Sequence, residues 1–437
     1  MRRLAIFALA PLVAAAAPLE LSLKRAVDLA LAPEGNARLE IAGEGVRQAQ
    51  SRAAQARATL LPNLDAAVSE QNMTRNLAAM GIQFNLPIPG FRFPTLVGPF
   101  NVFDVRASGT QTVFDFSAIR RFQAARVGVG AARSEQDNTA EQVAAQVARA
   151  YLAALKAEAD GEAVRANITL AEAIVKLAEN QKAAGTGTGI EITRARVQLA
   201  NERQRLLVVE NERRRARLQL LRAMGMRLDT EIELTDRLEY VPVDAGTLDE
   251  AKARALAARP DLKAQQEREA NTRLAAGAVK MERLPSLAAF ADYGSIGNGI
   301  TNALPTRTYG VSLRVPVFDG GRRDARRAEA ASQYRQERIR TTDLKDQIDL
   351  DVRVALDSLA SAEEQVKVAQ EGLELAGNEL NQAQRRYAAG VANSLEVTDA
   401  QTRLERARDN RTAALYNHNL ARIDLAQATG GMRRLIP

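Results

Sequence analysis

Hydrophobic and polar positions follow two rhythms along the chain, and the slower rhythm covers most of it. Between residues 321 and 389, large apolar residues recur at every seventh position, with an alanine three positions after nearly all of them. The large residues are Val352, Leu359, Val366, Leu373, Leu380 and Tyr387, and the alanines are Ala355, Ala362, Ala369, Ala376 and Ala383. Such a heptad pattern predicts a long α-helix in a left-handed supercoil, and the alanines allow neighbouring backbones to approach closely.

A second helix is predicted over residues 393–430, and it carries an alanine ladder of its own. The ladder consists of Ala400, Ala407, Ala414, Ala421 and Ala428. A helix with small residues along one stripe and large ones elsewhere packs closely against helical neighbours. We therefore expect these helices to have helical partners on more than one side.

The faster rhythm has a period of two and predicts β-strands. In residues 307–317 the apolar side chains Tyr309, Val311, Leu313, Val315 and Val317 alternate with polar or small ones, and residues 103–115 follow a similar pattern. Fainter strands are expected over about 64–73 and 287–295. Lipid on one face and water on the other would produce this alternation, and so would a half-buried soluble sheet.

The segment between the first two strands is rich in proline and aromatic residues. Four prolines lie between residues 76 and 101, which excludes a regular helix there. We interpret 76–101 as a long extracellular loop. The matching connection near 297–305 is short.

The order of these features repeats along the chain. Leu61-Pro62-Asn63-Leu64 returns as Leu284-Pro285-Ser286-Leu287, and Ala183-Ala184-Gly185 returns as Ala388-Ala389-Gly390. The sequence therefore predicts an internal duplication: a first repeat over 18–225, a linker over 226–247, a second repeat over 248–430 and a tail over 431–437. Each repeat has a helix, two strands, a long helix (118–184 or 321–389), a glycine turn and a last helix (190–225 or 393–430).

Helix lengths support a tall helical wall. The helix expected over 118–184 is about as long as those over 34–61 and 190–225 placed end to end, and the second repeat behaves alike. At about 1.5 Å per residue, each long helix would reach roughly 100 Å.

The N-terminus has the layout of a secretory signal peptide. Arg2 and Arg3 precede an apolar run, and small residues close it near Ala17. We expect residues 1–17 to be removed and the mature chain to be exported.

Composition argues against catalysis. The 437 residues include no cysteine and one histidine, which leaves no thiolate and no Cys/His metal site, and only His418 could serve a Ser-His-Asp triad. We expect no enzyme activity, no catalytic residue, no cofactor and no metal site, and we expect His418 to lie at a helix interface. The modest excess of 60 basic over 53 acidic residues, together with the export signal, argues against a nucleic-acid partner.

Several motifs together resemble the TolC-type outer-membrane efflux family across nearly the whole mature chain. They are the stretch from Leu21 to Leu31, the Leu61-Pro62-Asn63-Leu64 strand entry, Val315-Pro-Val-Phe-Asp-Gly-Gly321, and Tyr387-Ala-Ala-Gly390 followed by Ser394-Leu-Glu-Val-Thr-Asp-Ala-Gln401. The resemblance implies a homotrimer with four strands per protomer, a twelve-stranded β-barrel in outer-membrane lipid and a tunnel of coiled-coil helices in the periplasm. It implies a passive export channel of a tripartite efflux pump or type I secretion system, which works with a periplasmic adaptor protein and an inner-membrane pump. The alternative is an exported structural coiled-coil protein without a pore.

The resemblance also places a gate at the periplasmic tip, where the two helix-helix turns meet. The matching residues are Asp399, Glu396, Glu191, Arg194 and Tyr387, and the turn residues expected to contact an adaptor are Gly185, Thr186, Gly390 and Val391. Ala392 departs from the pattern, since some members carry arginine at that position.

A simpler reading exists for two of the acidic residues. Thr188 to Glu191 and Asn393 to Glu396 both have the spacing of a helix N-cap followed by an acid three residues later. From the residues alone, Glu191 and Glu396 fit capping as well as gating, whereas Asp399 lies beyond the first turn.

Overall fold

The computed structural model describes residues 19–33, 35–82, 90 and 94–432, so the expected signal peptide lies outside the described residues. The chain forms two compact units, one comprising residues 1–44, 134–262 and 343–437 and the other residues 45–133 and 263–342. Within the described part of the chain, no helix combines the length and the apolar character that crossing a membrane requires.

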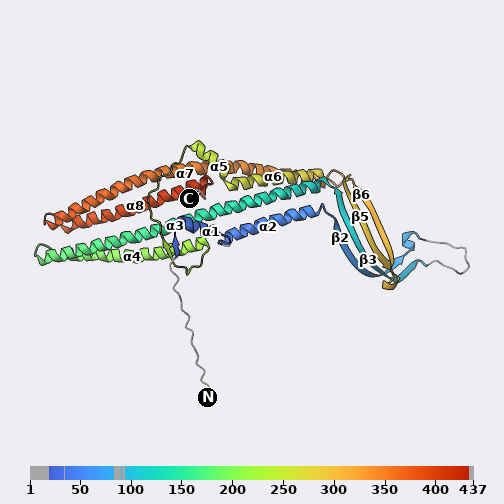
Figure 1. Cartoon of the computed structure of the whole chain (residues 1–437), viewed down its shortest axis with the longest axis horizontal. Coiled ribbons are helices and arrows are strands. Elements are labelled where there is room, and N and C mark those ends of the chain that lie inside the picture. The colour runs from blue at the N-terminus through green and yellow to red at the C-terminus, as the bar shows by residue number, and fades with distance from the viewer. Residues whose placement is uncertain (1–18, 34, 83–89, 91–93, 433–437) are drawn as a thin grey trace, which may run out of the picture. The chain divides into compact units, whose positions relative to one another are not determined.

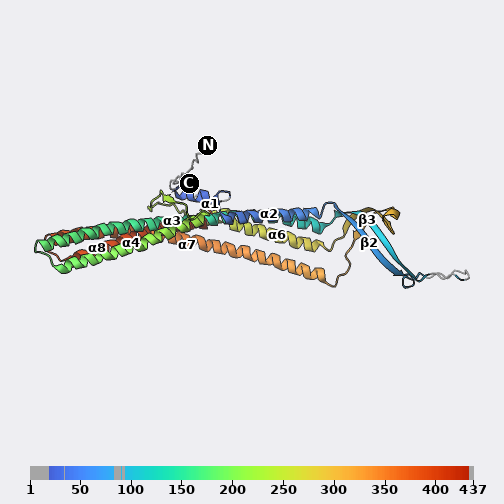
Figure 2. The ribbon, with the colours of Figure 1, turned by 90° about the horizontal axis from the view of Figure 1, so that it is seen from below.

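The first unit is built on two helical hairpins (Figures 1 and 2). One consists of α3 (Phe116–Ala183) and α4 (Gly189–Met224), and the other of α7 (Arg322–Ala388) and α8 (Ser394–Ala428). Both α3 and α7 continue into the second unit. Around the hairpins lie α1 (Leu23–Leu31), α5 (Leu248–Ala258) and a short parallel pair of strands, β1 (Leu19–Leu21) and β4 (Ile232–Leu234).

Three hydrophobic clusters hold this unit together. The largest surrounds Tyr151, whose hydroxyl donates to the Leu21 carbonyl at 2.9 Å and so fixes β1 on α3. A second cluster packs α5 against α7 and α8, and a third joins all four hairpin helices near their turns. The predicted heptad seam is the buried side of α7, since Val352, Leu359 and Leu380 are each at most 5% exposed.

The second unit contains a four-stranded antiparallel sheet in the order β2-β3-β5-β6. The strands are β2 (Asn63–Asn76), β3 (Leu96–Phe114), β5 (Ser286–Gly297) and β6 (Leu304–Arg314), with the 3-10 turns η1 (Ala78–Met80) and η2 (Ile300–Asn302) at the β2–β3 and β5–β6 connections. The helices α2 (Ala37–Ala58) and α6 (Pro260–Met281) lead into β2 and β5. Among the described residues, β2 and β6 each have one unpaired edge.

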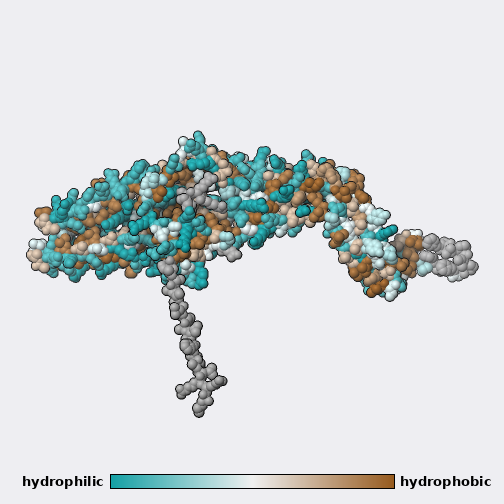
Figure 3. Space-filling model, in the orientation of Figure 1, coloured by the Kyte–Doolittle hydropathy of each residue, from teal (hydrophilic) through white to brown (hydrophobic). Residues whose placement is uncertain are grey.

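The strand register sorts the sheet into an apolar and a polar face. Paired positions on one face carry Leu64, Val68, Val105, Ala107, Ala289, Ala291, Tyr293, Tyr309, Val311 and Leu313. The opposite face carries Arg106, which forms ion pairs with Asp104 and Asp292 and donates to Thr306 Oγ1 at 3.2 Å. Hydrophobic patches are visible on the sheet in Figure 3. Large apolar side chains such as Tyr309 (78% exposed) have no covering layer within the described chain.

Two strand boundaries correct the sequence-based expectations. The loop expected over 76–101 is shorter, because β3 begins at Leu96 and Asn76 pairs with Leu96. The strand expected over 307–317 begins at Leu304 and ends at Arg314, so Val315 and Val317 lie beyond it. Its partner β5 begins at Ser286, directly after Pro285, which has no backbone N–H for a further ladder bond.

Candidate functional site

The two turns that end the hairpins share one backbone design. Gly185 (φ +75°) and Gly390 (φ +73°) adopt the left-handed conformation that terminates a helix without a Cβ clash. The next residue then donates back into the helix: Thr186 N to the Gln181 carbonyl and Val391 N to the Arg386 carbonyl, both at 3.0 Å. The four expected turn residues are exposed, which leaves them accessible at the hairpin tips.

Tyr387, near the end of α7, joins the two hairpins next to these turns. The residue is 4% exposed within the third cluster, and its carbonyl accepts from Gln181 Nε2 of α3 at 3.0 Å. Its hydroxyl has no hydrogen-bond partner among the described residues. Burial, together with the nearby carboxylate of Glu191, raises the pKa of Tyr387 above its usual value. The structure therefore brings Tyr387 and Glu191 together.

The two first-turn acids behave differently. Glu191 Oε2 accepts from the backbone N–H of Thr188 at 2.8 Å, as a capping residue does. At the matching position, Asn393 Oδ1 accepts from Glu396 N at 3.1 Å, while the Glu396 carboxylate pairs with Arg386 Nε at 3.0 Å across the turn. Glu396 thus joins α8 to α7 instead of capping its own helix.

Asp399 and Arg194 are not part of this network. Both side chains are exposed, and neither makes a hydrogen bond or ion pair within the described part of the chain. Asp399 follows Glu396 by three positions on α8, so the two carboxylates share one helix face. Arg194 lies on α4, one turn after Glu191.

A polar layer lies between α4 and α8, about two to three helical turns away from the hairpin turns, and the heptad pattern does not predict it. Gln198 and Glu202 of α4 face Gln401 and Glu405 of α8, and we call these four residues the carboxyl layer. Glu202 is 4% and Glu405 7% exposed. A repeated spacing could have revealed the layer, because Gln198, Glu202 and Arg205 recur as Gln401, Glu405 and Arg408.

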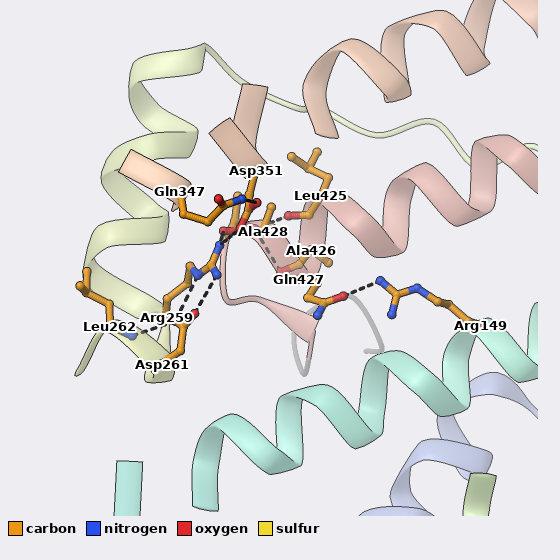
Figure 4. A network of polar contacts seen from close by, with 11 residues as sticks. Arg149, Arg259, Asp261, Leu262, Gln347, Asp351, Leu425, Ala426, Gln427 and Ala428 are labelled. Carbon is orange, nitrogen blue, oxygen red and sulfur yellow. Dashed lines mark hydrogen bonds and ion pairs between the residues drawn. The ribbon is translucent and has the colours of Figure 1, made fainter. Parts of the chain in front are cut away.

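A second polar network closes the other end of α8 (Figure 4). Arg259 donates to Asp351 Oδ2 at 2.9 Å, to Asp261 Oδ2 at 2.7 Å and to the Ala428 carbonyl at 3.4 Å. Only 13% of its side chain is exposed. Arg259 therefore ties the end of α8 to α7 and to the start of α6.

His418 lies on α8 against the linker, as expected for a helix-interface residue. It is 1% exposed, its ring centroid lies 4.7 Å from that of Tyr240, and its Nδ1 has no partner among the described residues. The Tyr240 hydroxyl donates to Glu363 Oε1 of α7 at 2.7 Å. Burial and the positive charge of Arg422 lower the pKa of His418, although Glu363 opposes this.

Comparison with known proteins supports an export function. A family model described as outer membrane efflux protein matches residues 29–226 and 253–431. The pyoverdine export outer membrane protein OpmQ is 25% identical in Pseudomonas putida (90% of this chain, 83% of the relative) and 26% identical in Pseudomonas aeruginosa (88% and 80%). The alkaline protease secretion protein AprF of P. aeruginosa is 23% identical over 70% of this chain and 65% of the relative.

Solved structures agree on the fold. The outer-membrane channel OprN superposes with a TM-score of 0.80 at 18% identity, covering 94% of this chain and 90% of that chain. The outer membrane protein VceC from Vibrio cholerae superposes with a TM-score of 0.79 at 19% identity, covering 94% and 96%. The expected fold class of long paired helices joined to a small sheet is thus confirmed.

These matches extend over both halves of the chain. The protein is an export channel of the outer membrane. Proteins of this kind are transport proteins and not enzymes. With the family model covering both repeats, the chain belongs to the outer membrane efflux protein family.

Proposed function

We propose that three copies of the chain form one passive channel, gated at the hairpin tips, that passes cargo delivered by an inner-membrane pump through a periplasmic adaptor. The channel itself performs no catalysis. The observation that carries this proposal is the four-stranded sheet, which has two unpaired edges and an uncovered apolar face among the residues that the structure describes.

The sheet argues for assembly. Exposed strand edges pair readily with other strands, and β2 and β6 offer such edges on the two sides of one sheet. Four strands are too few to close around a pore, because spanning structures of this type begin at about eight strands. Joining β6 of one copy to β2 of the next closes a twelve-stranded wall, whose apolar face meets lipid and whose Arg106 face meets water.

The hairpin tips suit a gate. The Gln181–Tyr387 hydrogen bond joins α3 of one hairpin to α7 of the other, so breaking it allows the hairpins to part. The Arg386–Glu396 ion pair lies within the second hairpin and holds α7 and α8 together as they move. Glu396 and Asp399 bring two carboxylates per copy, and three copies place six around one axis. Such a ring raises the negative potential and favours cations at the constriction. Glu191, as a capping residue, sets the start of α4.

The exposed turns suit an adaptor. Gly185, Thr186, Gly390 and Val391 lie at the ends of the two hairpins, and Val391 is 68% exposed. An apolar side chain next to small, exposed backbone is a surface that a helical partner can approach closely. We infer that the adaptor contacts both turns.

The relatives favour small-molecule cargo. The two relatives named for pyoverdine export align over at least 80% of their own lengths, and the relative named for alkaline protease secretion aligns over 65%. Secretion of a polypeptide is the second candidate.

Single-channel conductance in planar bilayers, read together with the mass of the purified protein in detergent, tests the proposal. Discrete conductance steps from a species with the mass of three chains are expected. A non-conducting species would instead favour an exported coiled-coil protein without a pore.

The gate assignment has its own test. We expect Asp399→Ala to weaken block of the pore by multivalent cations, because three of the six carboxylates are removed from the constriction. Glu364→Ala is the matched control, since Glu364 is an exposed α7 carboxylate paired with Lys367 far from the turn. Cation block unchanged in Asp399→Ala would remove Asp399 from the gate.

A further inference from the structure

The carboxyl layer holds two acids where acids rarely lie. Glu202 and Glu405 come from different hairpins and are both more than nine-tenths buried within a single chain. A buried carboxylate needs a cation or several hydrogen-bond donors, or else it takes up a proton. The nearby donors therefore decide its charge.

The donors are too few for two charges. A single amide nitrogen, Gln198 Nε2, lies 3.4 Å from both Glu202 Oε1 and Glu405 Oε1. Within the described chain, Glu202 Oε2 and Gln401 Nε2 are buried without a hydrogen-bond partner. Two carboxylates therefore share one long contact to Gln198, and the amides of Asn167 and Gln401 add only a weaker attraction at Glu202 and Glu405, respectively. One oxygen of Glu202 is left without a donor.

The charged groups around the layer do not supply the missing donors. On the α4 side Arg205 donates to Asp409 of α8, and Arg408 of α8 donates to Asn167 of α3. Asn167, which is 1% exposed, also faces Glu202. Arg205 attracts both carboxylates, but Asp409 opposes that attraction at Glu202.

We propose that Glu202 and Glu405 form a proton-binding site at the contact between α4 and α8, in which the two buried carboxyl groups, both next to Gln198 Nε2, share one negative charge. One proton neutralises one of the two carboxylates and removes the repulsion between two buried charges. When the proton leaves, the two helices carry adjacent negative charges at their contact. The site thus makes the contact between the hairpins stronger in acid and weaker in alkali.

The directions in which the pKa values of the two acids shift agree with this assignment. Burial raises the pKa of Glu202, and burial together with the charge of Glu202 raises the pKa of Glu405. An acid whose pKa is higher in the folded protein stabilises the fold less as the pH rises above the unfolded value of 4.5. The loss ends once the pH passes the folded pKa values.

The position of the layer links it to the gate. Glu405 follows Glu396 by nine residues on α8, or about 13 Å along the helix at 1.5 Å per residue. Separation of α4 from α8 at the layer therefore reaches the turns within three helical turns. Only this effect on opening rests on the proposed gate, whereas proton binding does not.

Infrared difference spectroscopy of the full-length protein in detergent tests proton binding directly. The measurement follows the carbonyl band of protonated carboxyl groups as the pH is raised from about 5 to about 8. We expect a band that persists above the range of ordinary glutamates in the wild type and is lost in the combined Glu202→Gln, Glu405→Gln variant. Glu371→Gln with Glu374→Gln, which removes two exposed acids of α7, is the matched control and should keep the band. A wild-type band indistinguishable from that of the carboxyl-layer variant would overturn the proposal.

The single variants guard against misfolding. Glu202→Gln and Glu405→Gln each leave one buried carboxyl that can bond to an amide, so both should fold, and in each the band should be weaker and should titrate at a lower pH than in the wild type, because the neighbouring negative charge is gone. Conductance recorded in parallel separates the two proposals, since absent channels would contradict the proposed function without affecting the spectroscopic result. A late-titrating band of wild-type strength and pH range in both single variants would assign the proton elsewhere and overturn the site.

Discussion

At the scale of single residues, His418 is a titrating group whose environment opposes charge. Its ring is buried against Tyr240, and burial and Arg422 lower its pKa below the ordinary 6.5. The unfolded chain therefore binds a proton that the folded chain resists, so stability falls as the pH drops below about 6.5 and stops falling below the folded pKa.

We expect His418→Phe to keep the contact with Tyr240 and to remove this loss. The variant and the wild type should have melting temperatures in detergent that diverge below pH ~6.5, with the variant higher, and that run parallel above it. The carboxyl layer acts with the opposite sign, so the Glu202→Gln, Glu405→Gln variant provides a contrasting control. Parallel curves for His418→Phe throughout the range would mean that His418 does not titrate differently on folding.

Two glycines with nearly the same φ allow the cost of backbone strain to be compared with the cost of a steric clash. Gly225, which ends α4, has φ +78°, and a Cβ there would lie 2.2 Å from the Gly35 carbonyl oxygen. Gly185 has nearly the same φ but nothing within 4 Å of the added atom. We expect Gly185→Ala to cost about 1–2 kcal/mol from backbone strain alone and Gly225→Ala to cost clearly more, measured by thermal melting. Equal losses would show that the Gly35 segment moves aside freely.

At the scale of elements, Arg259 joins the end of α8 and the start of α6 to the middle of α7. Removing it leaves the carboxylates of Asp261 and Asp351 without their shared cation and the Ala428 carbonyl without that donor. Breaking a largely buried pair by removing one partner costs about 3–5 kcal/mol. We expect Arg259→Ala to lower the melting temperature by several degrees and to increase proteolysis near the end of α8.

The matched control is Arg227→Ala. Arg227 pairs with Asp229 at 2.6 Å, but 85% of its side chain is exposed, and exposed pairs contribute little. A loss of stability for Arg227→Ala as large as that for Arg259→Ala would indicate a general effect of lost positive charge and not a specific clamp.

Local periodicity predicted these elements well and their polar contacts poorly. The heptad of α7 depends on neighbouring helices that repeat with it, so residues such as Val352 and Leu359 were assigned correctly to a buried seam. The start of β3 was missed because its pairing with β2 overrides the weak alternation near Pro99. The sequence also does not predict that Glu191 caps its helix while Glu396 forms an ion pair. Both residues have the spacing of a capping residue, and only the position of Arg386 distinguishes them.

At the scale of the whole molecule, the resemblance to a known family contributed what periodicity could not. Alternation along β6 is equally compatible with a half-buried soluble sheet and with a membrane sheet. What distinguishes them here is that the apolar face has no covering layer among the described residues. The proposed channel places lipid against this face, where burying its apolar side chains is favourable.

Neighbouring residues of β6 allow the two faces to be compared in one strand. Val311 is 67% exposed on the apolar face, and Ser312, also exposed, points to the face that carries Arg106. Lysine on a lipid-facing strand position costs about 2–4 kcal/mol near the bilayer midplane, whereas a water-facing position tolerates charge. We therefore expect Val311→Lys to reduce the amount of trimer recovered from outer membranes and Ser312→Lys to leave that amount unchanged while altering ion selectivity. Recovery reduced equally by both substitutions would contradict the assignment of faces, because a sheet with lipid on one side and water on the other must distinguish adjacent residues.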